Sequence, residues 1–182
     1  MTEQMKKLEA VKNRCTTTAK VVGVIEVICT IIAIITASIA LTFIIGMNKL
    51  NPMIEEGVNQ GYLDYEQFVN AGGVMGFKAI LSNNGNYALG IGITCLFATL
   101  AVVCVVVILA FIKKIFTIII EENSPFSERS LKTIKIGFIV ITVITVLGGS
   151  LGVTVITGFI LFCIYSIFEY GAALQTEIDE TL

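Results

Sequence analysis

Residues 131–169 read LKTIKIGFIVITVITVLGGSLGVTVITGFILFCIYSIFE, and they are almost entirely apolar after Lys135. A single helix of these 39 residues would be about twice as long as the ~30 Å hydrocarbon core of a bilayer. A glycine-rich segment, 148–152, interrupts the apolar run near its middle. We therefore expect the chain to turn there and to form a membrane hairpin with spans at about 133–147 and 153–168.

The composition of the whole chain agrees with a membrane protein. Its 182 residues are 55% hydrophobic and 14% charged, whereas charged residues make up about a quarter of a soluble globular domain. Two further apolar runs, at about 21–45 and 87–112, are each long enough to cross a bilayer. The first begins after about 20 mostly polar residues and is too long for the 7–15-residue core of a signal peptide, so we expect it to stay in the membrane. The sequence predicts an all-α integral membrane protein, with four transmembrane helices in one domain, 1–182.

The basic residues predict the orientation of these spans. Of the 12 lysines and arginines, five lie in residues 1–20, five lie between the end of the second span and Lys135 at the start of the third, and two lie in the segment 47–86. Cytoplasmic loops carry the excess of lysine and arginine in membrane proteins. Both termini are therefore predicted in the cytosol, including the tail 169–182, and the segment 47–86 is predicted to form an outer loop.

The outer loop and the N-terminal segment both show helical potential. In the loop we expect short helices at Met53–Asn59, Asp64–Asn70 and Val74–Leu81, because a loop of this length without secondary structure is uncommon. Turn signals at Asn51-Pro52 precede the first of them. Residues 1–20 place apolar side chains at spacings of three or four among basic ones, which fits either a short amphipathic helix on the inner leaflet or a basic tail that sets orientation.

Glu26 is the one ionisable residue inside the first apolar run. It lies about 9 Å inside Lys20 along a helix. An unpaired charge at such a depth costs on the order of 2–3 kcal/mol, so Glu26 is a candidate functional residue. The alternative is structural: its side chain reaches the inner interface, or it pairs with a lysine from another helix end.

Several predicted spans carry small residues at helical spacing. Such residues let a second helix approach closely, within the chain or in a copy of it. The residues concerned are Ala33, Ala37 and Ala40 in the first span, Ala88, Gly90 and Gly92 in the second, and Thr154 and Gly158 in the fourth.

The chain between the second and third spans predicts a helix end and a helix start. Lys113 and Lys114 fit the inner interface, with the helix continuing beyond them. Ser124 is a good N-cap with Pro125 at the first helical position, although Ser127 is a competing cap one turn later.

The tail keeps an apolar stripe after the fourth span ends, at Phe168, Gly171, Leu174 and Ile178. This stripe must cover the extension of the second helix, the turn at Pro125-Phe126, or another protein. The candidate ligand or partner residues, besides Glu26, are Pro125, Phe126, Phe168, Gly171, Leu174 and Gln175.

The same polar segments resemble a known family. The resemblance is carried by Ser124-Pro125-Phe126 followed by Arg129, Lys132 and Lys135, by IFEYGAALQ at 167–175, and by the acidic terminus DETL. These features resemble the DUF2975 family of small bacterial four-span membrane proteins of unknown function. Glu169 and Tyr170 depart from the basic residues that many members carry there. The resemblance implies a multi-pass protein of a bacterial cell membrane.

Several functions are disfavoured by the residue types present. Histidine is absent, and the five cysteines lie in apolar runs or near the N-terminus, so we expect no metal, no cofactor and no disulfide framework. The basic N-terminal segment lacks the interleaved aromatic residues of a nucleic-acid site. No nucleophile stands beside a candidate base, so we do not expect an enzyme.

The remaining prediction is a non-catalytic membrane interaction protein, either an accessory or sensory subunit or an immunity-type factor. Its expected partners are the lipid bilayer, a copy of itself, and another membrane or cytosolic protein. The alternative is an oligomeric small transporter or channel that uses Glu26.

Overall fold

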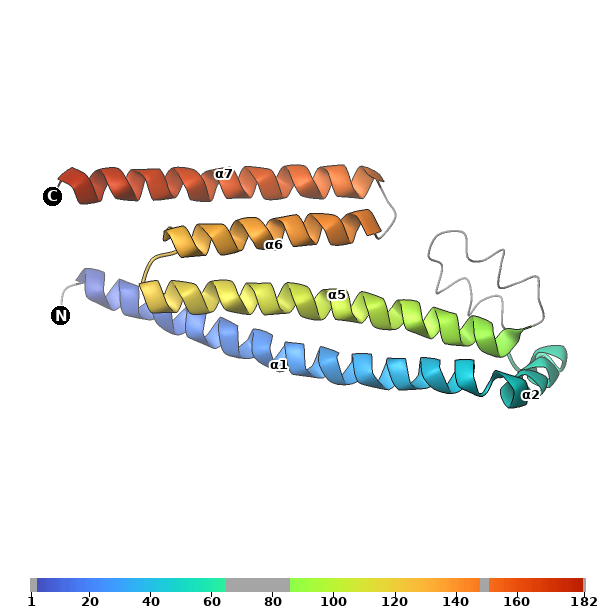
Figure 1. Cartoon of the computed structure of the whole chain (residues 1–182). Helices are drawn as coiled ribbons and strands as arrows, with labels where there is room; N and C mark the ends of the chain where they lie inside the picture. The colour runs from blue at the N-terminus through green and yellow to red at the C-terminus, as the bar shows by residue number, and fades with distance from the viewer. Residues whose placement is uncertain (1–2, 65–85, 148–150, 182) are drawn as a thin grey trace. The chain divides into compact units, whose positions relative to one another are not determined.

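The computed structural model describes residues 3–64, 86–147 and 151–181, and these residues form five α-helices (Figure 1). The helices are α1 (Glu3–Ile45), α2 (Met47–Asn59), α5 (Tyr87–Glu122), α6 (Glu128–Leu147) and α7 (Leu151–Thr181). They divide into two compact units, one formed by Met1–Val27 with Val106–Leu182 and the other by Ile28–Val105. Each unit is described by itself below.

Three segments of these helices are long and apolar enough to cross a membrane. They are Glu9–Ile45, Tyr87–Glu122 and Gly152–Glu177. The prediction of an all-α protein with membrane-spanning helices is confirmed at this level. Of the predicted glycine turn at 148–152, residues 151 and 152 belong to α7, and residues 148–150 lie outside the described residues.

Helix α1 joins the basic N-terminal segment to the first predicted span without a break. The segment is helical, as its spacing predicts, but it forms the start of a 43-residue helix instead of a separate short one. Its sequence explains this, because neither proline nor glycine occurs between Glu3 and Val22.

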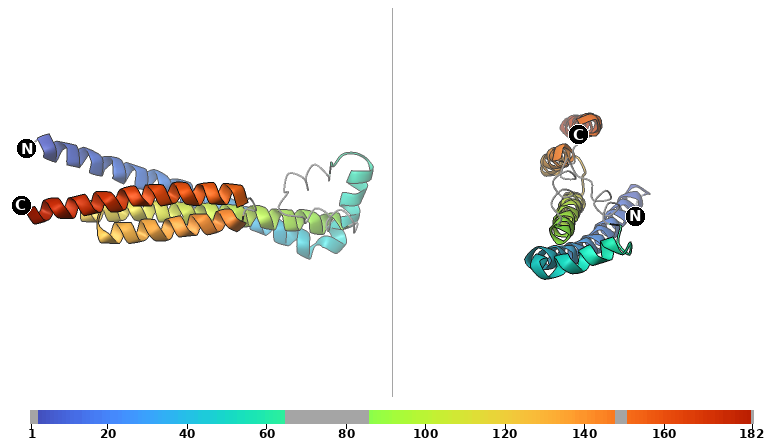
Figure 2. Two further views of the ribbon diagram at one scale, coloured as in Figure 1. Left: turned by 90° about the horizontal axis from the view of Figure 1, so that it is seen from above. Right: turned by 90° about the vertical axis from the view of Figure 1, so that its right-hand side faces the viewer.

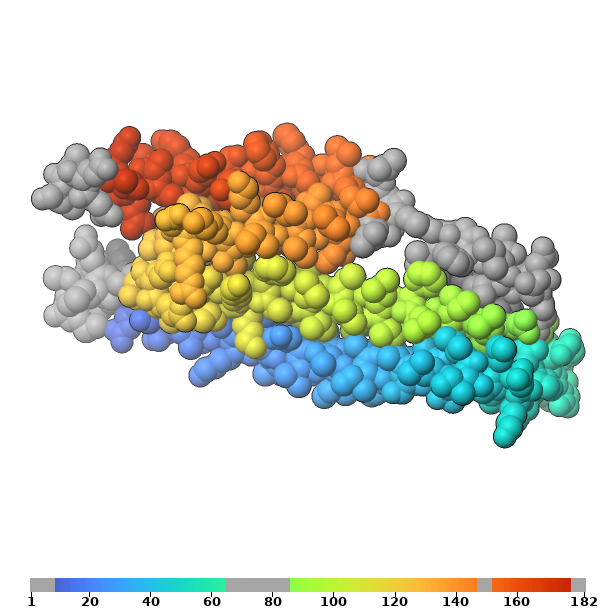
Figure 3. Space-filling view, viewed as in Figure 1, coloured from blue at the N-terminus to red at the C-terminus, as the bar shows by residue number. Residues whose placement is uncertain are grey.

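In the unit Ile28–Val105, α1 and α5 lie side by side (Figure 3), and their contact includes small residues that the sequence singles out. Ala40 and Ala88 are fully buried, and a Cβ atom added at Gly92 would lie 3.2 Å from the carbonyl oxygen of Ala40. The hydroxyl groups of Thr36 and Thr99 form a hydrogen bond of 2.9 Å across the same contact. Small residues and hydroxyl groups are the usual means of close packing between membrane helices. The predicted close-packing faces are therefore confirmed here.

Helix α2 corrects the predicted start of the outer-loop helices. It begins at Met47, six residues before the predicted Met53, and contains Pro52 in its interior. Asn51 does not form a turn, because its side-chain oxygen accepts a hydrogen bond of 3.1 Å from the backbone N–H of Ala88 at the start of α5. That N–H belongs to the first turn of a helix and has no partner within it. The other two predicted helices fall in 65–85, apart from Asp64, outside the described residues.

In the other unit, α6 and α7 form an antiparallel pair (Figure 2). A Cβ atom added at Gly158 would lie 3.6 Å from Cγ2 of Thr142, so Gly158 gives α6 a close approach to α7. Helix α7 does not end at the predicted limit of the fourth span, Phe168, but continues to Thr181. The tail is thus helical, as its apolar stripe predicts.

Candidate functional site

The candidate site is built around the corner between α5 and α6. Helix α5 ends at Glu122, and the next residue, Asn123, has a left-handed backbone conformation with φ of 53°. Asparagine tolerates this conformation and commonly ends helices in this way. Lys12 of α1 donates a hydrogen bond of 3.1 Å to the side chain of Asn123, which ties the start of the chain to the corner.

The start of α6 corrects the predicted helix start at Ser124 and Pro125. Helix α6 begins at Glu128, and Ser127 is its N-cap. The backbone N–H of Ser130 donates to Oγ of Ser127 at 3.2 Å, which is the usual bond from the third helical residue to the cap. The competing cap is therefore the one used, and Pro125 lies in the turn before the helix.

Ser124 has a different role, because it joins this turn to α7. Its Oγ accepts a hydrogen bond of 3.1 Å from the backbone N–H of Phe126, a local turn that serine often forms. The same hydroxyl donates to Oε1 of Gln175 at 2.9 Å. Ser124 and Gln175 are 51 residues apart in the sequence, so this hydrogen bond joins two distant segments.

Phe126 packs on α7 directly beside this bond. Its ring centroid lies 6.0 Å from that of Phe168, at an interplanar angle of 52°, within the range of favourable aromatic pairs. A Cβ atom added at Gly171 would come within 2.5 Å of Cε1 of Phe126. The ring therefore occupies the space that any side chain at Gly171 would need.

We call this set of contacts the corner–α7 contact, formed by Ser124, Phe126, Phe168, Gly171 and Gln175. The predicted stripe on the tail thus covers the Pro125-Phe126 turn, one of the alternatives that the sequence left open. Leu174 is not part of the contact and is 40% exposed. The side chain of Ile178 lies outside the described residues.

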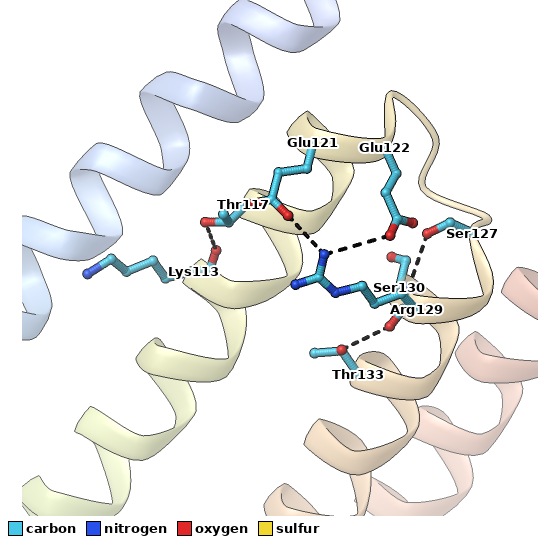
Figure 4. Close-up of polar contacts among 8 residues, drawn as sticks. All are labelled: Lys113, Thr117, Glu121, Glu122, Ser127, Arg129, Ser130 and Thr133. Atoms are coloured by element: carbon cyan, nitrogen blue, oxygen red, sulfur yellow. Dashed lines mark hydrogen bonds and ion pairs between the residues drawn. The ribbon is translucent and has the colours of Figure 1, made fainter.

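An ion-pair network on the outside of the corner was not predicted from the sequence (Figure 4). Nη1 of Arg129 lies 3.0 Å from Oε2 of Glu121 and 3.9 Å from Oε1 of Glu122. The signal was present, because two acidic residues end one helix and an arginine lies in the first turn of the next. The pairing depends on the tight turn between them, which only the structure shows.

Near this network, buried residues lie on both α5 and α6. Ile118 and Ile134 are almost fully buried, and Ser130 is completely buried. Within the described part of the chain, Oγ of Ser130 has no hydrogen-bond partner. Thr133 is buried beside it and donates to the carbonyl oxygen of Arg129 at 2.9 Å.

One exposed ion pair lies along the first turn of α6. Nζ of Lys132 is 2.7 Å from Oε1 of Glu128, four residues earlier. The hydrogen bond and the positive charge of Lys132 lower the pKa of Glu128, and those of Glu128 raise the pKa of Lys132. Exposed pairs of this kind contribute little to stability.

Glu26 lies away from the corner–α7 contact and has a partner from another helix. Nζ of Lys113 on α5 is 3.0 Å from Oε2 of Glu26 on α1. Gly23 lies beside this lysine, and a Cβ added there would be in ordinary van der Waals contact with Nζ, at 3.7 Å. The structural alternative for Glu26, a pair with a lysine from another helix, is the one that the structure shows.

The described residues contain no group of three or more histidine, cysteine, aspartate or glutamate side chains that could hold a metal ion. The five cysteines are all free. Comparison with known protein families, with curated proteins and with solved structures finds no match.

Proposed function

We propose that α6 is a fourth transmembrane helix beside the three apolar ones, and that the corner–α7 contact lies in the cytosol. The antiparallel pairing of α6 with α7 supports this, since both would cross the bilayer as a hairpin. Five basic residues support the side, because all five belong to one unit. Arg129 and Lys132 lie at the start of α6, Lys12 contacts Asn123 at the corner, and Lys113 and Lys114 lie about two to three turns before the end of α5. The resemblance to the DUF2975 family agrees with this topology and with a bacterial cell membrane.

The function that this arrangement supports best is that of a non-catalytic membrane interaction protein, an accessory or sensory subunit or an immunity-type factor. The observation that carries it is that the cytosolic part of α7 has two faces with different roles. One face holds the corner through Phe168, Gly171 and Gln175. This contact fixes the helix and leaves its second face open.

The second face consists of Ile167, Tyr170 and Leu174, which are 69%, 66% and 40% exposed. Their spacing of three and four repeats that of the first face, shifted by one residue, so the two faces are about 100° apart around the helix. Tyr170 and Leu174 lie beyond the predicted span at 153–168, where exposed apolar side chains need a cover, and tyrosine is enriched in protein interfaces. The partner that fits is the apolar face of a helix from another membrane protein.

Affinity capture from native membranes tests this function. The full chain carrying Tyr170→Ser is compared with the unchanged protein and with Phe159→Ser, which alters an equally exposed aromatic residue, 67% exposed, earlier on α7. We expect Tyr170→Ser to lose a crosslinked partner that Phe159→Ser keeps. Recovery of copies of the chain alone, together with unchanged behaviour after truncation at Tyr170, would rule the proposal out.

The pair of Glu26 and Lys113 favours a second candidate, an oligomeric transporter or channel. Ionisable groups within membrane spans often mark a path for ions or solutes. This pair is partly exposed, with side-chain exposures of 23% for Glu26 and 49% for Lys113. Flux measured in proteoliposomes for the unchanged chain and for Glu26→Gln tests it. An absence of flux under ion and solute gradients would remove this candidate.

A further inference from the structure

A groove of about 480 Å³ runs between α6 and α7, within the size range of small-molecule sites. Its floor is apolar and is formed by residues such as Phe138, Thr142 and Gly158. Its polar residues, Lys135, Tyr165 and Glu169, lie together at one end. This is the end where α6 begins and where α7 leaves its predicted span, so the groove is polar at the proposed inner interface and apolar toward the bilayer centre.

Two opposite charges at the polar end do not neutralise one another. Nζ of Lys135 lies 5.8 Å from the ring centroid of Tyr165, a cation–π distance. Glu169 follows Tyr165 by four residues and so lies on the same face of α7. Among the described residues, neither Lys135 nor Glu169 has an ion-pair partner. Both remain available to a ligand that carries a negative and a positive group.

We propose that this groove binds a membrane phospholipid with an ethanolamine headgroup. The phosphate pairs with Lys135, the primary ammonium group donates hydrogen bonds to Glu169, and an acyl chain lies over Phe138, Thr142 and Gly158. This proposal rests on the proposed membrane crossing of α6 and α7 and is independent of the partner proposed for Tyr170.

The charges and the dimensions both favour this ligand. A phospholipid without the ammonium group would leave Glu169 unpaired beside a second negative charge. A choline headgroup has no N–H to donate to a carboxylate. The groove extends along α6 from Lys135 to Val143, about 12 Å at the rise of a helix, close to the ~15 Å of hydrocarbon in one leaflet.

Native mass spectrometry of the full chain in detergent tests the proposal. It is titrated with phosphatidylethanolamine, phosphatidylglycerol and phosphatidylcholine that share the same acyl chains. We expect the ethanolamine lipid to bind about two- to fivefold more tightly than the other two, as one partly exposed ion pair would give. Glu169→Gln removes this preference, and Lys135→Gln weakens all three lipids by a similar factor.

Two variants on α7 test the proposed binding of the acyl chain. Gly158→Leu fills the groove and is expected to weaken all three lipids about tenfold or more. Gly152→Leu is the control, because an added Cβ there meets nothing within 4 Å. Glycerophosphoethanolamine, which has the headgroup without acyl chains, is expected not to bind measurably.

Three results would overturn the proposal. The first is an ethanolamine preference that is absent, or that survives Glu169→Gln, an exposed substitution that leaves the helices intact. The second is equal lipid binding by Gly158→Leu and the unchanged chain. The third is the finding that the unchanged chain is a dimer and that Gly158→Leu makes it a monomer with lipid binding unaffected, which would make the groove an interface between copies. The partner-capture result at Tyr170 bears on none of these outcomes.

Discussion

The ring of Phe126 lies over Gly171, so close that a Cβ atom added to the glycine would come within 2.5 Å of the ring. Gly171→Ala therefore forces the ring off α7, and we expect it to lower the free energy of unfolding by about 1–3 kcal/mol, as overpacking does. Thermal unfolding in detergent measures this. Gly152→Ala is the matched control on the same helix and should be neutral or slightly stabilising, because its Cβ enters open space.

The same prediction has an internal check. Phe126→Ala removes the ring, so Gly171→Ala should no longer be destabilising in that background. An equal loss of stability from Gly171→Ala with and without the ring would show that the contact does not explain the effect.

The start of α6 depends on Ser127 and not on Ser124. Ser127→Ala removes the bond from its hydroxyl to the N–H of Ser130 and is expected to cost about 1 kcal/mol, the usual effect of losing an N-cap. Hydrogen exchange at the amide of Ser130 should become faster. Ser124→Ala is the control, which should leave this amide unchanged and weaken the contact with Gln175 instead.

The pair of Glu128 and Lys132 predicts a pH dependence at the start of α6. Because Lys132 lowers the pKa of Glu128, the carboxyl group stays ionised below its ordinary value of 4.5. Its contribution to stability is present above that value and is lost as the pH falls through the lowered pKa. An NMR titration of the Glu128 carboxyl carbon should show this shift, and Lys132→Ala should return the pKa to the ordinary range. A titration unaffected by Lys132→Ala would contradict the assignment.

The proposed topology predicts opposite sides for two exposed residues. In a background without the five native cysteines, Asn59→Cys should react with an impermeant maleimide added to intact cells, because the proposed topology places α2 outside. Glu177→Cys should react only after the membrane is opened. Reaction of both in intact cells would mean an even number of spans between them. It would contradict the three proposed spans and the cytosolic tail, and would require a different assignment for α6.

Much of the helix packing could be predicted from residue size and spacing alone. Ala40, Gly92 and Gly158 lie at close contacts because only small residues permit them, and this requirement is visible in the sequence. The ion pair of Glu26 could be predicted in the same way. An unpaired charge inside a span is costly, and a pair with a lysine is one of the few arrangements that avoid it. The apolar stripe on the tail predicted a packing partner, because an apolar face that continues beyond a span must pack on another surface.

The start of α6 and the turn before it could not be predicted in this way. Ser124 and Ser127 are both suitable caps, and the choice between them depends on Gln175, a residue 51 positions away. The start of α2 depends similarly on Asn51, whose side chain caps α5 at Ala88 instead of forming a turn. Contacts between distant segments determine where these helices begin, and local sequence patterns contain no information about such contacts.

The most direct test of the account is site-specific photo-crosslinking in native membranes, with the photoreactive side chain placed in turn at Tyr170 and at Leu174. These two positions lie on the second face of α7, about 100° around the helix from the face that contacts Phe126. The account predicts a discrete adduct with another membrane protein from both positions, and its loss when Ile167→Ser is added. Adducts with lipid or with copies of the chain alone, from both positions, would contradict the proposal that this face binds a partner.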